Sequence, residues 1–354
     1  MVSTVHHYNR LLVSVLIFLV QTDMPFCCGP DEKAEQEIAI DDSPVVEQVI
    51  LKASELPNGE KKEVEVNGRK LVVINDNGQY LCVNGLCAHY NYPLVNGVYS
   101  KGKLRCPLHG ACFSAKTGDI EDYPTFDSLN SYKVTKVGEN LVIRTSEKCL
   151  SSDRRTRKVP KFTVSKENPI VIVGGGTAGE SAAENLRNAG CKAPIKIITK
   201  NTNKPYDVVM LSKKPGIDIN NIRLRTDDYY TENHIEVVTD TEVVDFEGAS
   251  HYVTLSDKTS LAYSKLILAT GGKVRKLSNK GANAKGVHTL RVVEDGHAIA
   301  RDADGKDVVC VGASFIGMET ASALREQARS VTVISTTEEP VPAFTPDVGK
   351  AIRK

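Results

Sequence analysis

Two short segments of the chain each pair a cysteine with a histidine, and these pairs constrain the fold more than any other feature. The first segment is Cys87-Ala88-His89, and the second, after sixteen intervening residues, is Cys106-Pro107-Leu108-His109. Thiolate sulfur and imidazole nitrogen are ligands for soft and borderline metals. Four unrelated residues and a tetrahedral zinc site remain alternatives. If the four residues act together, the fold must present two loops at one end of a scaffold.

The scaffold around these segments has the pattern of an all-β domain. Asn67-Gly68 and Asp76-Asn77-Gly78 predict tight hairpin turns, and Gly138-Glu139-Asn140 predicts a third turn. Residues 87–124 interrupt the strand pattern with Gly, Pro, Cys and His, so we expect two loops mounted on a small β domain. The expected strands are 45–53, 62–66, 70–74, 79–83, 132–137 and 141–145.

The two loops resemble those of the Rieske iron–sulfur family, in which C-x-H and C-x2-H loops hold a [2Fe-2S] cluster. The resemblance covers about residues 45–145 and implies that Cys87 and Cys106 bind one iron while His89 and His109 bind the other. Residues at positions typical of the family are Gly97, Gly102, Pro107, Gly110 and Phe113.

Two departures from the respiratory members of that family indicate a subtype. Tyr92 and Leu108 stand where those members carry a pair of bridging cysteines. Ala111 and Phe113 stand where they carry hydroxyl donors, which stabilise the reduced cluster. We therefore expect a reduction potential at the bottom of the Rieske range of about −150 to +300 mV.

Beyond the β domain, the pattern changes first to a basic segment and then to alternating strands and helices. Expected elements of this last part include a strand at 170–173 and a strand at 195–198. We therefore divide the chain into an N-terminal tail (1–40), a Rieske-like domain (41–146), a basic linker (147–168) and an α/β region (169–354). The expected fold class is multidomain: a small all-β domain followed by a Rossmann-like region.

A glycine-rich turn follows the strand at 170–173 and opens a helix. Gly174 allows the tight turn, Gly176 lets a pyrophosphate approach the backbone, and Gly179 lets helix and strand pack closely. The phosphate charge would lie at the helix N-terminus. Expected apolar residues on the buried face of this helix are Ala178, Ala182, Leu186 and Ala189.

A second motif of the same kind follows the expected strand at 308–311. It contains Gly312 and Gly317, but Ser314 takes the place of the middle glycine, and its side chain would narrow the approach to the backbone. This motif and its flanking strands predict a second dinucleotide-binding lobe.

The two motifs, together with residues between them, resemble the flavoprotein disulfide-reductase fold, whose members bind FAD and NAD(P)H. Further matching segments are Pro205-Tyr206-Asp207, Leu211-Ser212-Lys213 and Thr270-Gly271. The resemblance implies that the first motif and Thr270-Gly271 bind FAD and the second motif binds NAD(P)H. It also implies that Lys213 pairs with Glu319 beside the flavin ring, where they are the candidate catalytic residues.

The reductase half departs from that family in three places. The usual carboxylate for a ribose hydroxyl is missing after each second strand, where Thr199-Lys200 and Ser335 stand. Val208 replaces an arginine expected near the flavin. The second lobe has only two clear strands, so we expect the region to be incomplete at its C-terminus and to bind nucleotides poorly.

The order of the domains resembles the apoptosis-inducing factor-like family that carries an N-terminal Rieske domain. This resemblance implies an NAD(P)H-dependent flavin oxidoreductase that passes electrons through FAD to the Rieske cluster and then to an unknown acceptor, with a link to cell death. The alternative is a Rieske-type electron carrier whose reductase region is not catalytic.

Composition excludes some partners and indicates a compartment. The 45 basic and 44 acidic residues give a net charge of +1, which argues against a nucleic-acid partner. Nine cysteines, an odd number, favour a reducing compartment, cytoplasmic or mitochondrial. The apolar run 11–20 is too short to span a bilayer but is compatible with a signal-peptide core, part of a mitochondrial leader or weak membrane association.

Overall fold

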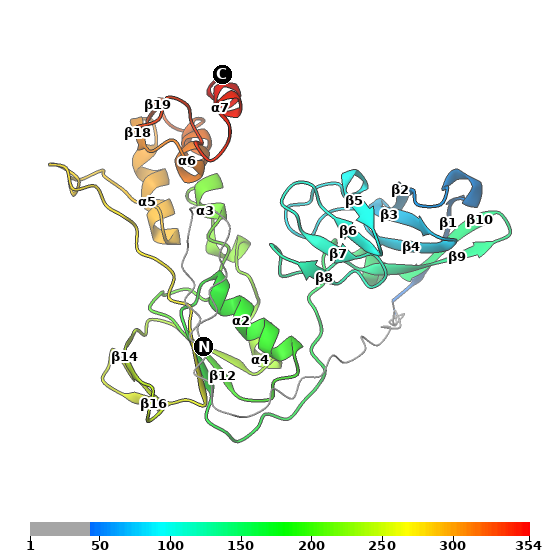
Figure 1. Cartoon of the computed structure of the whole chain (residues 1–354), viewed down its shortest axis with the longest axis horizontal. Coiled ribbons are helices and arrows are strands. Elements are labelled where there is room, and N and C mark those ends of the chain that lie inside the picture. The colour runs from blue at the N-terminus through cyan, green and yellow to red at the C-terminus, as the bar shows by residue number, and fades with distance from the viewer. Residues whose placement is uncertain (1–42) are drawn as a thin grey trace. The chain divides into compact units, whose positions relative to one another are not determined.

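A computed structural model describes residues 43–354, which form two compact units that meet in sequence after Pro160 (Figure 1). The predicted N-terminal tail with its apolar run lies outside the described residues. Within residues 43–354, no helix is long and apolar enough to cross a membrane.

The first unit contains a six-stranded antiparallel sheet in the spatial order β1-β10-β9-β4-β3-β2. All six predicted strands are present. Their bounds are β1 Val45–Lys52, β2 Lys61–Val66, β3 Arg69–Asp76, β4 Gln79–Asn84, β9 Ser131–Val137 and β10 Asn140–Ser146, and the short helices η1 Ala53–Glu55 and α1 Glu147–Leu150 follow β1 and β10.

The two predicted Asn-Gly hairpins are confirmed. Asn67 and Gly68 join β2 to β3 with φ values of 47° and 75°, and Asn77 and Gly78 join β3 to β4 with φ values of 53° and 87°. Two consecutive left-handed residues match the right-handed twist of the flanking strands, and asparagine and glycine tolerate that conformation best. These turns therefore set the register of the sheet.

A second antiparallel sheet, in the order β5-β6-β7-β8, lies in the segment where we expected only loops. Its strands have three residues each, too few for a recognisable alternation of apolar and polar side chains. The sheet carries the second Cys/His segment in the connection from β6 to β7. Its bounds are β5 Val98–Ser100, β6 Lys103–Arg105, β7 Cys112–Ser114 and β8 Ile120–Asp122, and η2 Leu94–Asn96 precedes it.

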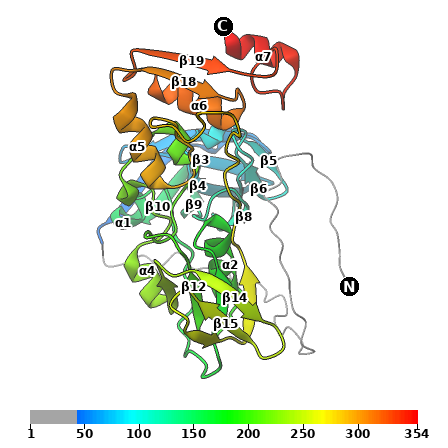
Figure 2. The ribbon, with the colours of Figure 1, turned by 90° about the vertical axis from the view of Figure 1, so that its left-hand side faces the viewer.

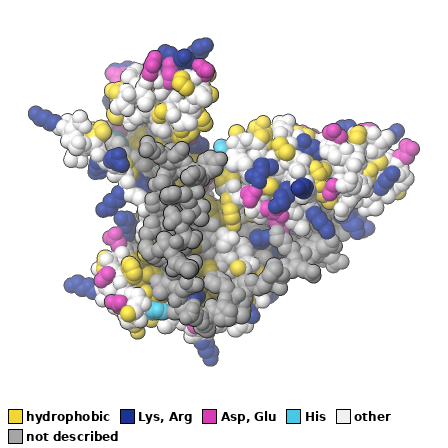
Figure 3. Space-filling view, in the orientation of Figure 1, with side chains coloured by type: hydrophobic (Ala, Val, Ile, Leu, Met, Phe, Trp, Pro, Cys, Tyr) yellow, Lys and Arg dark blue, Asp and Glu magenta, His cyan; other side chains and the backbone are white. Residues whose placement is uncertain are grey.

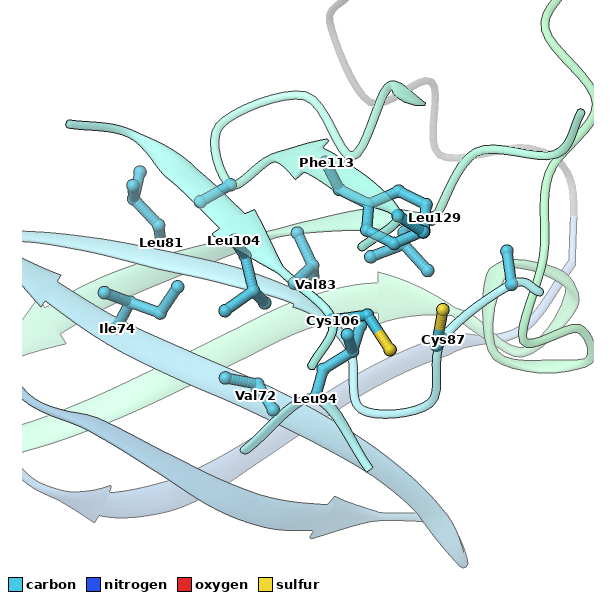
Figure 4. Packing of buried hydrophobic residues seen from close by; sticks show 13 residues of the cluster. Val72, Ile74, Leu81, Val83, Cys87, Leu94, Leu104, Cys106, Phe113 and Leu129 are labelled. Carbon is cyan, nitrogen blue, oxygen red and sulfur yellow. The ribbon is translucent and has the colours of Figure 1, made fainter. Parts of the chain in front are cut away.

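Strand β3 is buried on both faces, because it separates two apolar clusters. Leu71 and Val73 belong to the cluster inside the six-stranded sheet. Val72 and Ile74 face the other way, toward the second sheet and the two Cys/His segments. Figure 4 shows this second cluster, in which side chains from β3 and β4 pack against Leu104, Phe113 and Leu129. The core thus reaches the base of both ligand loops.

The basic linker is held at both ends. On the side of the first unit, the Arg155 guanidinium donates to the Asp119 carboxylate at 2.6 Å. On the side of the second unit, the Arg187 guanidinium lies over the Phe162 ring, 4.9 Å from its centroid. The linker is therefore not an exposed tether along its whole length.

The second unit begins with a parallel four-stranded sheet in the order β13-β12-β11-β17, which confirms the predicted βαβ unit. Helix α2 (Thr177–Asn188) joins β11 to β12, and Gly190, with a φ of 79°, lies in the turn beyond it. The parallel strands are β11 Ile170–Val173, β12 Ile195–Ile198, β13 Ile235–Val238 and β17 Lys265–Leu268.

The predicted buried face of α2 is confirmed in part: Ala182 and Leu186 pack against the core, whereas Ala178 and Ala189 are exposed. The buried residues are Gly179, Glu180, Ala183, Glu184 and Arg187. Three charged side chains lie on this face because each has polar partners there. The Arg187 guanidinium, for example, donates to the carbonyl oxygens of Asn233, Cys191, Ala193 and His234. Apolar periodicity misses part of such a face because it counts buried charged residues as exposed.

Figure 2 shows the parallel sheet and the small antiparallel sheet β14-β15-β16 toward one end of the second unit, and the strands β18 and β19 with α6 and α7 toward the other. As predicted, β18 and β19 are the two parallel strands of the second lobe. The remaining elements are α3 Met210–Lys213, η3 Ile219–Asn221, α4 Asp227–Glu232, β14 Val243–Glu247, β15 Tyr252–Leu255, β16 Ser260–Ala262, α5 Val293–Ala303, β18 Asp307–Val311, α6 Phe315–Leu324, β19 Ser330–Ile334 and α7 Pro346–Arg353.

Charged side chains of the first unit lie next to charges of opposite sign. On the face shown in Figure 3, basic and acidic side chains are interspersed over this unit. Ion pairs of the first unit include Lys62–Glu55, Arg69–Asp153, Lys70–Glu63 and Lys103–Glu121.

Gly118, in the turn between β7 and β8, provides a test of the fold. Its φ is 76°, and a Cβ atom there would lie 2.3 Å from the Leu129 carbonyl oxygen. Gly138 has a φ of 59° but open space around it. We predict that Gly138→Ala costs about 1 kcal/mol of unfolding free energy, from backbone strain alone, and that Gly118→Ala costs about 2 to 4 kcal/mol, because overpacking adds to the strain. Urea unfolding followed by circular dichroism measures both; equal costs would contradict the crowding at Gly118.

Candidate functional site

The first ligand loop leaves β4 and is closed by two backbone hydrogen bonds around Cys87. The Cys87 N–H donates to the Tyr92 carbonyl at 2.9 Å, and the Asn91 N–H donates back to the Cys87 carbonyl at 2.9 Å. Asn91 has a φ of 55°, the left-handed conformation that asparagine tolerates. The loop therefore turns back within five residues of the cysteine and places His89 at its tip.

The second ligand loop leaves β6 and is closed in the same way. The Cys106 N–H donates to the Ala111 carbonyl at 2.8 Å, and the Gly110 N–H donates to the Cys106 carbonyl at 3.1 Å. Gly110 has a φ of 80° and occupies the place that Asn91 has in the first loop. The two loops thus share one pattern of backbone hydrogen bonds. The histidine lies two residues after the cysteine in the first loop and three residues after it in the second.

The structure brings the four predicted ligands together, with both sulfur atoms buried and the His89 ring partly buried. Cys87 is 1% exposed and Cys106 2% exposed, and Figure 4 shows their sulfur atoms on neighbouring loops above the apolar core. The rings of His89 and His109 are 4.9 Å apart between centroids, and His109 is exposed. Burial raises the pKa of the Cys87 thiol to about 11, so a bound metal has to displace its proton.

Two thiols and two imidazoles are the donor set of a two-iron Rieske cluster, and the same donor types also suit a zinc ion. A tetrahedral zinc site needs its protein ligands around one ion. In the two-iron cluster, by contrast, each iron takes two protein ligands.

Side chains that sequence reasoning did not single out support both loops. The Tyr90 ring stacks on His89 at 3.9 Å between centroids and meets the His109 ring edge-on at 5.6 Å. The Thr125 hydroxyl donates to the Ala88 carbonyl at 3.5 Å. Tyr90 could have been noticed as an aromatic residue next to a candidate ligand, whereas Thr125 carries no such local signal.

In the second unit, the first glycine motif has the geometry that its sequence predicts. A Cβ atom on Gly174 would lie 2.1 Å from the Ala269 carbonyl oxygen, and one on Gly179 would lie 2.0 Å from the Gly174 carbonyl oxygen. Side chains at these two positions would therefore separate β11 from α2 and from β17. Gly176 differs, because a Cβ atom there would meet nothing within 4 Å. That open space is where a pyrophosphate would approach.

Thr270 and Gly271 lie beside this turn. They follow β17, which pairs in parallel with β11, so both segments leave the same edge of the sheet. The carboxyl ends of parallel strands are where open α/β sheets bind ligands. The predicted FAD-binding residues are thus brought together.

The second motif repeats the geometry of the first with one side chain added. Ser314 has a φ of −92° and a ψ of −171°, against −93° and −174° for Gly176. A Cβ atom on Gly317 would lie 1.8 Å from the Gly312 carbonyl oxygen, which matches the close approach of Gly179 to the Gly174 carbonyl in the first motif. The backbone is therefore preserved, and the serine side chain is the difference.

Lys213 and Glu319, which are distant in sequence, form the predicted pair. The Lys213 Nζ atom lies 3.0 Å from a Glu319 carboxylate oxygen, and the Ser212 hydroxyl donates to the same oxygen at 2.6 Å. Burial alone would raise the pKa of Glu319, but these two hydrogen bonds hold it below its ordinary value. The pair borders a cavity of about 520 Å³ lined by residues that include Phe315, Met318 and Phe344.

Ser335, which replaces the usual carboxylate after β19, is engaged within its own turn. Its hydroxyl is 2.8 Å from the Thr337 hydroxyl and accepts from the Thr337 N–H at 3.1 Å. The Thr337 hydroxyl donates to the Glu339 carbonyl at 2.9 Å. The position is therefore neutral and internally hydrogen-bonded.

Comparison with known proteins gives the class. Residues 168–354 match the family model of pyridine nucleotide-disulphide oxidoreductases, and residues 46–133 match the Rieske [2Fe-2S] domain. The chain belongs to the pyridine nucleotide-disulphide oxidoreductase family and carries a Rieske domain in front of it. Both matches confirm the predicted fold class and resemblances.

Similar proteins include apoptosis-inducing factor 3 from Homo sapiens, 38% identical over 315 residues, which are 87% of this chain and 52% of that protein. Rubredoxin-NAD(+) reductase from Pseudomonas putida is 38% identical over 47% of this chain and 44% of its own. A solved structure, the covalent putidaredoxin reductase–putidaredoxin complex, has 31% identity and a TM-score of 0.49, covering 53% of this chain and 47% of that one. The chain spans about half the length of the curated relatives it matches.

The two families imply the cofactors. A Rieske domain implies a [2Fe-2S] cluster, and the oxidoreductase family implies FAD and NAD(P)H. The buried thiol pair with its two imidazoles fits the first, and the open space at Gly176 fits the pyrophosphate of the second.

Gly176→Val tests the flavin position. The backbone at Gly176 is extended, so valine introduces no strain, and the added side chain fills only open space. We predict loss of bound flavin from the full chain, measured by absorption after gel filtration. Gly248→Val, in an open turn after β14, is the matched control and should keep its flavin. Flavin retained by the Gly176 variant at the control's level would contradict this position.

Helix α2 also carries a buried acid that the sequence analysis missed. Glu180 is fully buried, and its Oε2 accepts from the Tyr230 hydroxyl at 2.9 Å, while its Oε1 is buried without a hydrogen bond. Burial raises its pKa to about 7; the nearby Glu184 adds to this, and Tyr230 and Arg225 oppose it. The local signal is a glutamate directly after the third glycine.

The raised pKa predicts a pH-dependent stability. Between the ordinary value of 4.5 and about 7, the native state keeps a proton on Glu180 that the unfolded chain has lost, so stability falls as pH rises through this window. The loss from this group is about 3 kcal/mol. We predict that Glu180→Gln removes this fall of unfolding free energy with pH, whereas Glu232→Gln, at an exposed position, does not change it. Urea unfolding at several pH values, followed by helical circular dichroism, measures both. A slope unchanged in the Glu180 variant would contradict the assignment.

Proposed function

We propose that the protein is an NAD(P)H-dependent flavin oxidoreductase that passes electrons through FAD to its own Rieske cluster and on to an acceptor. One observation carries the proposal. A paired-thiol, paired-imidazole site and a glycine turn open to a pyrophosphate occur in the same chain. When bound, FAD would supply the exchange between hydride transfer and single electrons, and a [2Fe-2S] cluster would supply a one-electron acceptor.

In the first unit, the proposed ligands are Cys87, Cys106, His89 and His109. The buried thiolates hold the inner iron away from water, and the neutral imidazoles leave less negative charge on the outer iron, which eases its reduction. The exposed His109 gives electrons an exit at the surface.

In the second unit, the glycine turn positions the FAD pyrophosphate, and the second motif positions the nucleotide. Lys213 and Glu319 bridge α3 and α6, so they tie the two motifs' lobes together at the cavity. The proposed role of Lys213 is to hold a positive charge beside the flavin ring, where Glu319 and Ser212 keep it oriented.

Partners and location are part of the same proposal. Relatives named as rubredoxin and ferredoxin reductases favour a small electron-carrier protein as a relevant acceptor class. The cysteine content favours the cytoplasm or the mitochondrion. The name of the apoptosis-inducing factor 3 relatives suggests a link to cell death, which the site chemistry does not require.

Anaerobic titration with NADH and with NADPH tests the proposal. We predict that one or both bleach the flavin of the full chain and that the electron-spin-resonance signal of a reduced Rieske cluster then appears. His109→Cys should shift that signal toward the plant-ferredoxin type and lower the potential, while flavin bleaching continues. Flavin-free protein with an intact cluster would favour the alternative, an electron carrier with a non-catalytic reductase region. Zinc in place of iron and sulfide would overturn both.

A further inference from the structure

Arg105, which directly precedes the proposed ligand Cys106, has a side chain that reaches around the second ligand loop. Its Nη1 donates to the Gly110 carbonyl at 2.7 Å. Its Nη2 forms an ion pair with Asp122 on β8. Within the sheet, its backbone pairs with Cys112, at the start of β7. One residue thus connects the beginning of the loop, the end of the loop and a neighbouring strand.

The contact with Gly110 lies near the end of the second ligand loop. Gly110 follows His109, has a left-handed φ of 80° and donates its N–H to the Cys106 carbonyl. Its own carbonyl accepts from the Arg105 Nη1 atom. The Arg105 guanidinium fixes the next peptide, Gly110–Ala111, through its carbonyl, so both peptide groups that flank Gly110 are held by hydrogen bonds.

The same side chain brings a positive charge to the loop. Arg105 and Asp122 are about half exposed, at 49% and 56%, so their ion pair by itself adds little stability. The two charges differ in their contacts, however: the Arg105 cation contacts the loop directly, and the Asp122 anion on β8 contacts that cation. Reduction adds one negative charge to a cluster held by this loop, and a cation in contact with the loop favours that charge.

Resting on the proposed cluster ligation, we propose that Arg105 is a positioning residue for the second ligand loop and that the Arg105–Asp122 pair tunes the cluster's midpoint potential. Removal of the cation disfavours the reduced state and lowers the potential. Removal of the anion leaves the cation unbalanced and raises it. Removal of Arg105 and removal of Asp122 should therefore shift the midpoint potential in opposite directions. An ion pair with only a structural role would not have this effect.

The chain offers a matched control two residues away. Lys103 lies on the same side of β6 as Arg105 and forms an ion pair with Glu121 on β8, at 2.6 Å. The two pairs therefore join the same two strands with the same charges. They differ in that the Arg105 side chain also contacts the ligand loop.

The experiment is a potentiometric titration of the full chain, followed by the electron-spin-resonance signal of the reduced cluster. We expect Arg105→Gln to lower the midpoint potential, Asp122→Asn to raise it, and Lys103→Gln to shift it much less than either. Arg105→Lys should restore much of the potential, because it restores the charge. It should not restore the loop, because lysine lacks the planar fork.

Release of iron to a chelator reports the positioning role separately. Both Arg105 variants should lose iron several-fold faster than wild type, and the Lys103 variant should match wild type. A potential in Arg105→Gln no lower than in Lys103→Gln, or shifts of the same sign in Arg105→Gln and Asp122→Asn, would overturn the proposal. If Arg105→Gln does not fold, the sign of the Asp122→Asn shift still decides. A wild-type chain without a Rieske signal would overturn the cluster ligation itself, whereas a normal signal with unmoved potentials would overturn only this inference.

Discussion

The two ligand loops of the first unit depend on the same pair of backbone hydrogen bonds. In each loop, the cysteine N–H donates to the carbonyl of the fifth residue after it, and the N–H of the fourth residue, which has a left-handed φ, donates to the cysteine carbonyl. These hydrogen bonds reverse each loop next to the core, where both sulfur atoms are buried, the His89 ring is partly buried and the His109 ring is exposed. Because β4 and β6 belong to different sheets, the two loops converge only when those sheets pack together. The apolar cluster beneath Cys87 and Cys106 is therefore as necessary to the site as its ligands.

Sequence reasoning succeeded in the first unit where the signal was local. Asn67-Gly68 and Asn77-Gly78 determine hairpins by their own conformational preference, and the spacing of the Cys/His pairs marks the loops. It failed for β5 to β8, because three-residue strands are too short to display a period. Arg105 was missed for a related reason: its role depends on Asp122, seventeen residues away, and on a backbone carbonyl that has no sequence signature.

The second unit shows the same division. The glycine motif was predictable because Gly174 and Gly179 each approach a backbone oxygen that excludes any side chain. The pairing of Lys213 with Glu319 came only from resemblance, since no pattern links residues so distant in sequence. The buried face of α2 was predicted only in part, because Glu180, Glu184 and Arg187 pack inward with polar partners, and a hydrophobicity pattern counts them as outward-facing.

The near-identical backbone angles of Gly176 and Ser314 bear on how long a nucleotide stays bound. If the first turn binds the proposed FAD, its bare backbone would allow short contacts and slow dissociation, as a resident cofactor requires. In the proposed scheme, the hydroxymethyl group of Ser314 would hold a second dinucleotide farther from the backbone and so shorten its residence time. A reductase must exchange its spent nucleotide at every turnover, and a side chain added to an otherwise unchanged turn would suit that need.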